Sequence, residues 1–98
     1  MSDPSDSAEV QAHVRIRGRV QGVYFRGKLR EQAQMWGVRG LVRNMPDGSV
    51  EALLQGQKER VDAVVAWAHR GPRGAIVESV EVEWEPVEQR LPTFEVRG

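Results

Sequence analysis

Apolar side chains recur along the first third of the chain in two different periods. Residues 10–17 alternate between apolar and polar, which is typical of a half-buried strand. Residues 25–36 instead place apolar side chains at i, i+4, i+8 and i+11, which predicts one buried face of a helix. Gly37 is suited to end that helix in a left-handed conformation. The positions are Val10, Ala12, Val14 and Ile16 for the strand, and Phe25, Leu29, Ala33 and Trp36 for the helix.

The rest of the chain repeats this strand and helix pattern. A turn with proline second and glycine fourth is expected at residues 45–48, between two strands. A second helix ends at Gly71-Pro72. The expected elements are a strand at 38–44, a strand at 49–55, a helix around 61–68, a strand around 80–85 and a short strand with Phe94 and Val96. The order is βαββαβ with one extra strand, which predicts an α+β sandwich: a mainly antiparallel sheet covered on one face by two helices.

This topology brings distant segments together. Right-handed crossovers make the first and second strands parallel, with the third between them. The carboxyl ends of the first two strands then lie at the same edge of the sheet. The segment 18–26 and Asn44 are therefore expected to approach each other.

Composition limits the classes of protein to consider. The chain has 98 residues, 40% of them hydrophobic and 29% charged, with no cysteine, which fits one domain without disulfides. No apolar run is long enough to span a bilayer. Residues 1–8 are polar and acidic, unlike a secretory signal. We expect them to form a disordered tail before a domain at 9–98, in a cytoplasmic protein that is a monomer by default.

The net charge of zero hides an asymmetry. Residues 10–44 carry eight basic groups and one acidic group, a net charge of +7, whereas residues 45–98 carry a net charge of −4. A positive field favours anionic ligands. The plainer interpretation, that most of these side chains only solvate exposed faces, stays open for all of them except Arg26.

The segment 18–26 reads Gly-Arg-Val-Gln-Gly-Val-Tyr-Phe-Arg and connects the first strand to the first helix. Glycines let a backbone approach an anion, and the N–H groups at a helix start have no internal partners. Arg26 adds a charged fork suited to two oxygens of a phosphate or carboxylate. Alone, an arginine in a first helical turn usually forms a surface ion pair. Gly18 and Gly22 could serve tight turning alone, and Gln21 reads as a solvated loop residue.

This segment resembles the first signature of the acylphosphatases, and a second signature of that family appears as Gly-Leu-Val-Arg-Asn-Met-Pro-Asp-Gly at 40–48. The resemblance covers residues 9 to 97. It implies a ferredoxin-like sandwich and hydrolysis of the carboxyl–phosphate anhydride of small acyl phosphates. It also implies that Arg26 binds the phosphate and that Asn44 orients the attacking water. The phosphate-cradling amides would be those of Arg19, Val20, Gln21, Gly22 and Val23.

Two features qualify the resemblance. The family usually has a large aromatic residue where this chain has Leu41, a difference that concerns packing beneath the second signature. Asn44, just before a Pro-Asp-Gly turn, could also be a turn former that bonds its own backbone.

The residue types near the signatures favour direct attack by water without a metal or other cofactor. Residues 10–48 contain no serine, threonine or cysteine. The one hydroxyl group in this segment is that of Tyr24. His13 and His69 are isolated, and no carboxylate pair accompanies either signature. A nucleophile with a nearby base is not evident.

Two alternatives remain. One is a non-catalytic module that binds phosphate or carbamoyl phosphate on the same fold. The other, an RNA-binding βαββαβ domain, needs aromatic side chains on its central strands, and the strand at 49–55 has none. We therefore expect a small-molecule substrate and no nucleic acid or membrane partner.

Overall fold

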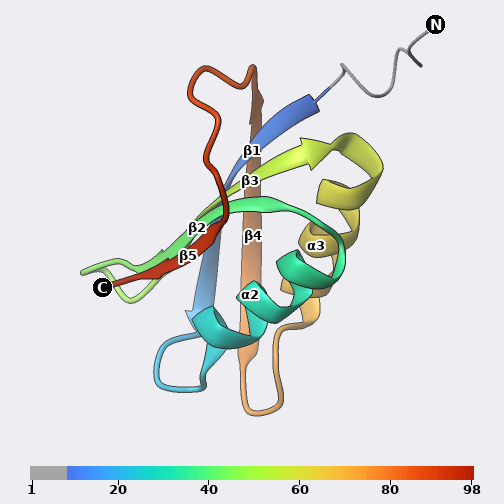
Figure 1. The fold of residues 1–98 in the computed structure, drawn as a ribbon. Coiled ribbons are helices and arrows are strands. Elements are labelled where there is room, and N and C mark those ends of the chain that lie inside the picture. The colour runs from blue at the N-terminus through green and yellow to red at the C-terminus, as the bar shows by residue number, and fades with distance from the viewer. Residues whose placement is uncertain (1–8) are drawn as a thin grey trace, which may run out of the picture.

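The computed structural model describes residues 9–98, which form a mixed five-stranded sheet with two helices packed on one face (Figure 1). The predicted α+β architecture is confirmed. The predicted tail, residues 1–8, lies outside the described residues. The strands are β1 (Glu9–Arg19), β2 (Arg39–Asn44), β3 (Val50–Gln57), β4 (Ile76–Glu85) and β5 (Phe94–Arg97), and the helices are α2 (Phe25–Met35) and α3 (Lys58–Arg70).

The order of strands across the sheet is β4-β1-β3-β2-β5. Strand β3 pairs antiparallel with both β1 and β2, so β1 and β2 run parallel on either side of it, as predicted. Strand β5 pairs parallel with β2 at the edge. Ile16 near the end of β1 and Asn44 at the end of β2 are both in register with Val50. This register places Asn44 beside the loop that leaves β1.

The core lies between the sheet and the helices. Alternate side chains of β1 point into it, and Ala12, Val14 and Ile16 are all at most 1% exposed. Fully burying a Val, Ile, Leu or Phe side chain is worth about 1.5–3 kcal/mol. The helices contribute Phe25, Leu29, Ala33, Val61, Val64 and Ala68.

One expected core residue is not buried. Trp36 follows the last residue of α2 and is 44% exposed, because the helix ends before its i+11 position returns to the sheet. Trp67 of α3 supplies aromatic packing instead. Its ring meets that of Phe25 edge to face, with the ring centroids 5.4 Å apart.

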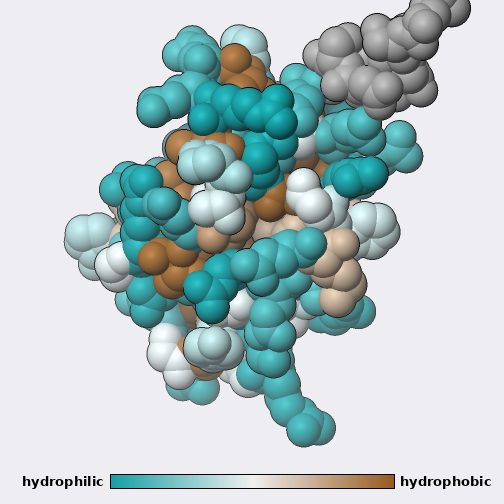
Figure 2. Space-filling model, in the orientation of Figure 1, coloured by the Kyte–Doolittle hydropathy of each residue, from teal (hydrophilic) through white to brown (hydrophobic). Residues whose placement is uncertain are grey.

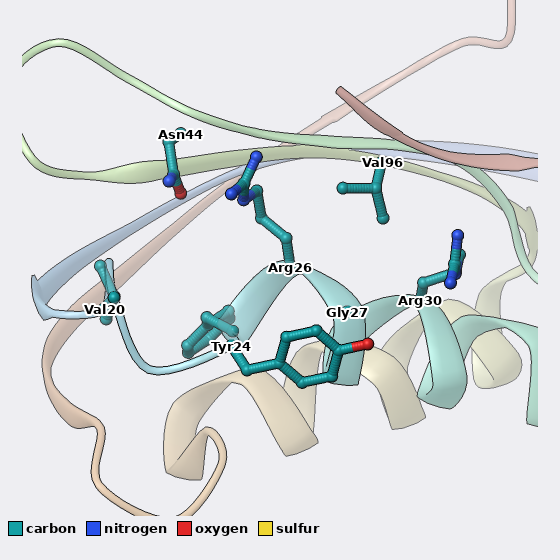
Figure 3. Close-up of a pocket in the computed structure, with 9 residues that line it drawn as sticks. Val20, Tyr24, Arg26, Gly27, Arg30, Asn44 and Val96 are labelled. Atoms are coloured by element: carbon teal, nitrogen blue, oxygen red, sulfur yellow. The ribbon is translucent and has the colours of Figure 1, made fainter. Parts of the chain in front are cut away.

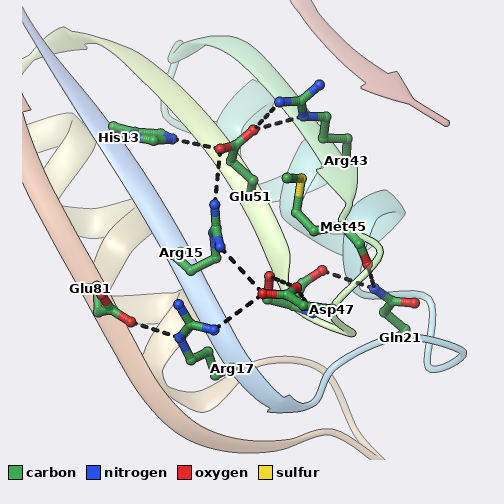
Figure 4. A network of polar contacts seen from close by, with 10 residues as sticks. His13, Arg15, Arg17, Gln21, Arg43, Met45, Asp47, Glu51 and Glu81 are labelled. Carbon is green, nitrogen blue, oxygen red and sulfur yellow. Dashed lines mark hydrogen bonds and ion pairs between the residues drawn. The ribbon is translucent and has the colours of Figure 1, made fainter.

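The opposite face of the sheet is not covered by helices and carries a network of charges (Figure 4). Glu51 lies at its centre and accepts hydrogen bonds from Arg43 Nε at 2.7 Å and Arg15 at 3.4 Å, and it pairs with His13 Nε2 at 2.8 Å. Burial raises the pKa of Glu51, but the contacts with His13 and Arg43 outweigh it and hold that pKa below its ordinary value.

The same face holds four of the eight basic side chains of residues 10–44 in ion pairs. Arg17 binds Glu81 at 2.8 Å and reaches Asp47 at 3.3 Å, and Arg39 binds Glu9 at 2.7 Å. These arginines and those of the Glu51 network are matched by acids. These four side chains therefore do more than solvate an exposed face, because each is engaged in an ion pair on the sheet.

Candidate anion site

The connection from β1 to α2 uses glycine where the backbone demands it. Gly18 has φ +128°, and a Cβ there would lie 2.1 Å from the carbonyl oxygen of Ile76 on β4. The register of β1 with β4 shifts at this point. Gly22 has φ +76°, a conformation that other residues rarely adopt. Both glycines are thus needed for the turn, and the turn directs the loop toward the start of α2.

Tyr24 precedes α2 in a left-handed conformation, with φ 59° and ψ 32°. It is the one non-glycine residue within 9–98 with a positive φ. Such a conformation costs about 1 kcal/mol or more and is often found at functional sites. It lays the Tyr24 ring over Gly27, where an added Cβ would lie 2.3 Å from the phenol Cζ. The ring therefore depends on glycine at 27.

A pocket of about 370 Å³ lies between this loop, the first two turns of α2 and the ends of β2 and β5. Arg26 rises from the helix toward the sheet, and Asn44 points from β2 toward the loop, so the two polar side chains converge (Figure 3). The prediction that segment 18–26 approaches Asn44 is confirmed. The lining residues are Val20, Gly22, Tyr24, Phe25, Arg26, Gly27, Arg30, Asn44 and Val96.

Both converging side chains have unused hydrogen-bonding capacity. Arg26 Nη1 donates to the carbonyl oxygen of Arg97 at 3.0 Å, which engages one of the five N–H bonds of its guanidinium. Asn44 Oδ1 is buried and has no partner within the described part of the chain. An unsatisfied buried acceptor costs about 1–3 kcal/mol, and such atoms commonly bind water or a ligand.

The loop also offers backbone N–H groups beside the pocket. No backbone acceptor within residues 9–98 is recorded for the N–H groups of residues 20–23, and the first hydrogen bond of α2 runs from Lys28 N to the Tyr24 carbonyl. Of the five residues expected to present amides, Val20 and Gly22 line the pocket. Arg19 is the last residue of β1. Gln21 and Val23 belong to the loop but not to the pocket lining.

Gln21 has a role that the sequence pattern did not reveal. Its Nε2 donates to the carbonyl oxygens of Met45 at 2.8 Å and Ser49 at 2.9 Å, so it ties the loop to the turn that follows Asn44 (Figure 4). The interpretation of Gln21 as a solvated loop residue is wrong. Neither periodicity nor charge marks such a residue, because its partners are backbone atoms 24 and 28 positions away.

The fold and the pocket together define a class of protein: a small α+β sandwich with a candidate anion site at the start of its first helix, where the N–H groups and helix dipole favour negative charge. The chain belongs to the acylphosphatase family, whose model matches residues 12–96. The family resemblance of the two signatures is thereby confirmed.

Individual relatives agree with this assignment. The acylphosphatase of Thermococcus kodakarensis is 54% identical, over 91% of this chain and 97% of its own length. That of Rubrobacter xylanophilus is 52% identical, over 89% of this chain and 79% of its own length. The structure of an acylphosphatase from Coxiella burnetii superposes with a TM-score of 0.89 at 32% identity, covering 98% of this chain and 100% of that one.

Leu41, which replaces the usual aromatic, pairs with Leu53 across β2 and β3 and is 8% exposed. The next residue on the strand, Val42, points into the core beneath the helices. Because successive side chains of a strand alternate, Leu41 points to the other face of the sheet. The departure from the family pattern therefore lies away from the pocket.

Proposed function

We propose that the pocket hydrolyses the carboxyl–phosphate anhydride of small acyl phosphates to a carboxylate and inorganic phosphate. Arg26 and the amides of residues 19–23 hold the phosphoryl group, and Asn44 orients the attacking water. The observation that carries this proposal is the convergence of the Arg26 and Asn44 side chains above the loop (Figure 3). The assignment of the chain to the acylphosphatase family supports it.

Hydrolysis of an acyl phosphate requires few groups from the protein. Phosphoryl transfer depends mainly on positioning and on stabilising charge at the equatorial oxygens. Water oxygen bonds to phosphorus, the bond from phosphorus to the acyl oxygen breaks, and the carboxylate leaves with the bonding electrons. One proton of the water passes to a phosphate oxygen, and the other stays on the oxygen that has bonded to phosphorus. Arg26 and the loop N–H groups stabilise the charge throughout.

The reaction proceeds without a metal ion or a covalent phosphoenzyme. The lining side chains that carry polar groups are two arginines, one amide and one phenol, which are donors to an anion rather than the carboxylates that bind Mg²⁺. Residues 20–27 contain no Ser, Thr, Cys or His. A positioned water is then the nucleophile.

The protein acts as a cytoplasmic monomer on a diffusing small molecule. No helix within residues 9–98 is long and apolar enough to cross a membrane. The face of the molecule in Figure 2 is mostly hydrophilic, with separate hydrophobic patches rather than one broad apolar surface, and broad apolar surfaces mark stable interfaces. Size-exclusion chromatography with light scattering tests the monomer.

A hydrolysis assay tests the function. The purified protein, with a chelator present, is given benzoyl phosphate and, separately, phenyl phosphate. We expect rapid hydrolysis of the anhydride and none of the monoester, because the carboxylate is a good leaving group and phenoxide is not. Strong monoesterase activity, or loss of anhydride hydrolysis with the chelator, would contradict the mechanism. Phosphate binding without turnover would favour the non-catalytic module.

A further inference from the structure

Tyr24, the residue before α2, has a strained backbone conformation. Its φ is 59° and its ψ is 32°, and within residues 9–98 every other residue with a positive φ is a glycine. A left-handed conformation is unfavourable for a residue with a bulky side chain. Such strain persists where the surrounding structure holds it, and it is concentrated at functional sites. The contacts that hold Tyr24 therefore bear on how the site is built.

The ring of Tyr24 lies on the backbone of Gly27, in the first turns of α2 (Figure 3). A Cβ at Gly27 would lie 2.6 Å from Cε1 and 2.7 Å from Cε2 of the ring, so a larger residue would displace the ring. The ring covers Gly27, which is buried although Tyr24 itself is 64% exposed. No side-chain hydrogen bond caps this end of α2. The ring is thus the side-chain contact that holds residue 24 against the helix.

The conformation of Tyr24 also sets the path of the loop before it. Gly22 has φ +76°, so a residue with a positive φ stands on either side of Val23. Turns that contain left-handed residues aim successive N–H groups toward one concave side, where an anion can bind. Gly22 and Tyr24 line the same pocket, and no backbone acceptor within residues 9–98 is recorded for the N–H groups of residues 20–23. The backbone of residue 24 thus connects these donors to the helix.

We propose that Tyr24 is a positioning residue for the loop amides. Its ring, seated on Gly27, holds residue 24 in the left-handed conformation and keeps the N–H groups of residues 20–23 aimed at the place of the phosphoryl group. This inference rests on the proposed function. Without the ring, residue 24 relaxes toward a negative φ, and a bound phosphate must first restore the loop. Tyr24 acts through its backbone and not through its hydroxyl group.

The first test compares the affinity for inorganic phosphate of the wild type, Tyr24→Ala and Tyr24→Gly by calorimetric titration. Both variants lack the ring, but glycine adopts the left-handed conformation readily and alanine does not. We therefore expect Tyr24→Ala to bind phosphate roughly fivefold more weakly than Tyr24→Gly. Equal affinities in the two variants would overturn the inference, because the side chain would then act only as a wall of the pocket or through its hydroxyl group.

A second test addresses the contact with Gly27. Gly27→Ala should increase helix propensity, and yet it should weaken phosphate binding severalfold, because the added Cβ displaces the ring. Urea denaturation shows whether the variant stays folded. Combining Gly27→Ala with Tyr24→Gly should restore the affinity to that of Tyr24→Gly alone, since no ring is then left to displace. An unchanged affinity in Gly27→Ala, or a double variant weaker than Tyr24→Gly, would contradict the role of the contact.

Met35→Ala is the matched control, because it removes a large side chain that is 73% exposed at the other end of α2. Its phosphate affinity should equal that of the wild type. A loss as large as that of Tyr24→Ala would mean that any change in the helix has this effect, which overturns the inference. If the wild type binds no phosphate, the proposed function fails and the inference fails with it. If the wild type binds phosphate but the variants do not follow the expected order, the inference alone fails.

Discussion

The side-chain amide of Gln21 donates a 2.8 Å hydrogen bond to the carbonyl oxygen of Met45, the residue directly after Asn44. The same nitrogen also reaches the carbonyl of Ser49 at 2.9 Å, and the Met45 N–H in turn donates to Ser49. One side chain thus joins the loop between β1 and α2 to both ends of the turn that connects β2 to β3. This contact links the two halves of the candidate site.

Replacing Gln21 with Ala should loosen that junction. Unfolding free energy should fall by about 1 kcal/mol, the net worth of a typical hydrogen bond, and kcat should fall about tenfold as Asn44 loses its alignment. Urea denaturation and steady-state kinetics measure the two effects. Gln34→Ala, at an exposed position of α2, is the control. A stability loss with kcat unchanged would mean that Gln21 supports only the fold.

Arg26→Ala should abolish most turnover and weaken the binding of inorganic phosphate. A charge-assisted contact is worth about 1.5–3 kcal/mol, so at most about a tenth of wild-type activity should remain. Arg26→Lys should be nearly as damaging, because a point charge replaces a planar fork. Kinetics with benzoyl phosphate and calorimetric titration of phosphate check both variants. Retention of most activity in Arg26→Ala would exclude Arg26 as the phosphate ligand.

Asn44→Ala should separate chemistry from binding. If Asn44 orients water, kcat falls by about a hundredfold or more, whereas the affinity for inorganic phosphate stays almost intact. Because the buried Oδ1 has no partner within residues 9–98, its removal should not lower the unfolding free energy. Equal losses of kcat and phosphate affinity would refute the proposed role.

Gly40, at the start of the second signature, should tolerate no side chain. Its φ is +147°, and an added Cβ would lie 1.7 Å from the carbonyl oxygen of Leu53 on β3. Gly40→Ala should therefore cost about 2–4 kcal/mol of unfolding free energy, since both the backbone strain and the steric clash must be relieved. Gly48→Ala is the control, because φ is +91° there but nothing lies within 4 Å. Comparable losses in the two variants would show that the clash is unimportant.

Glu51→Gln should make the unfolding free energy less dependent on pH in the acidic range. The pKa of Glu51 is lowered in the folded protein, so its carboxylate contributes stability that is present above the ordinary pKa of about 4.5 and lost as the pH falls through the folded-state value. At pH 7 the variant should be less stable by about 1–3 kcal/mol, and the difference should shrink as the pH falls below the ordinary pKa of a glutamate. Urea denaturation at several pH values measures this, with exposed Glu83→Gln as the control. A difference that grows in acid would contradict the assignment.

The periodicity of the chain predicted most of its strands and helices, and the two signatures predicted its family. The strand alternation at 10–17 and the helix face at 25–33 follow from local burial, so they could be recognised from spacing alone. Trp36 was misplaced because a helix end is set by backbone capping, here at Met35 and Trp36, rather than by continuation of a pattern. Leu41 and Trp36 show that a hydrophobic residue in sequence can face away from the helices or remain exposed.

By itself the sequence determined the order of elements and the family, and it marked Arg26 and Asn44 as candidate site residues, because short-range spacing and residue type carry that information. The tertiary structure decided which charges are neutralised and which are available. Arg15, Arg17 and Arg43 find acids on neighbouring strands, whereas Arg26 and Arg30 line the pocket. The linkage through Gln21 depends on strand register and on contacts between segments that lie 24 and 28 residues apart in the sequence. Electrostatic partners are fixed only when those segments are brought together, so no local pattern along the chain could specify them.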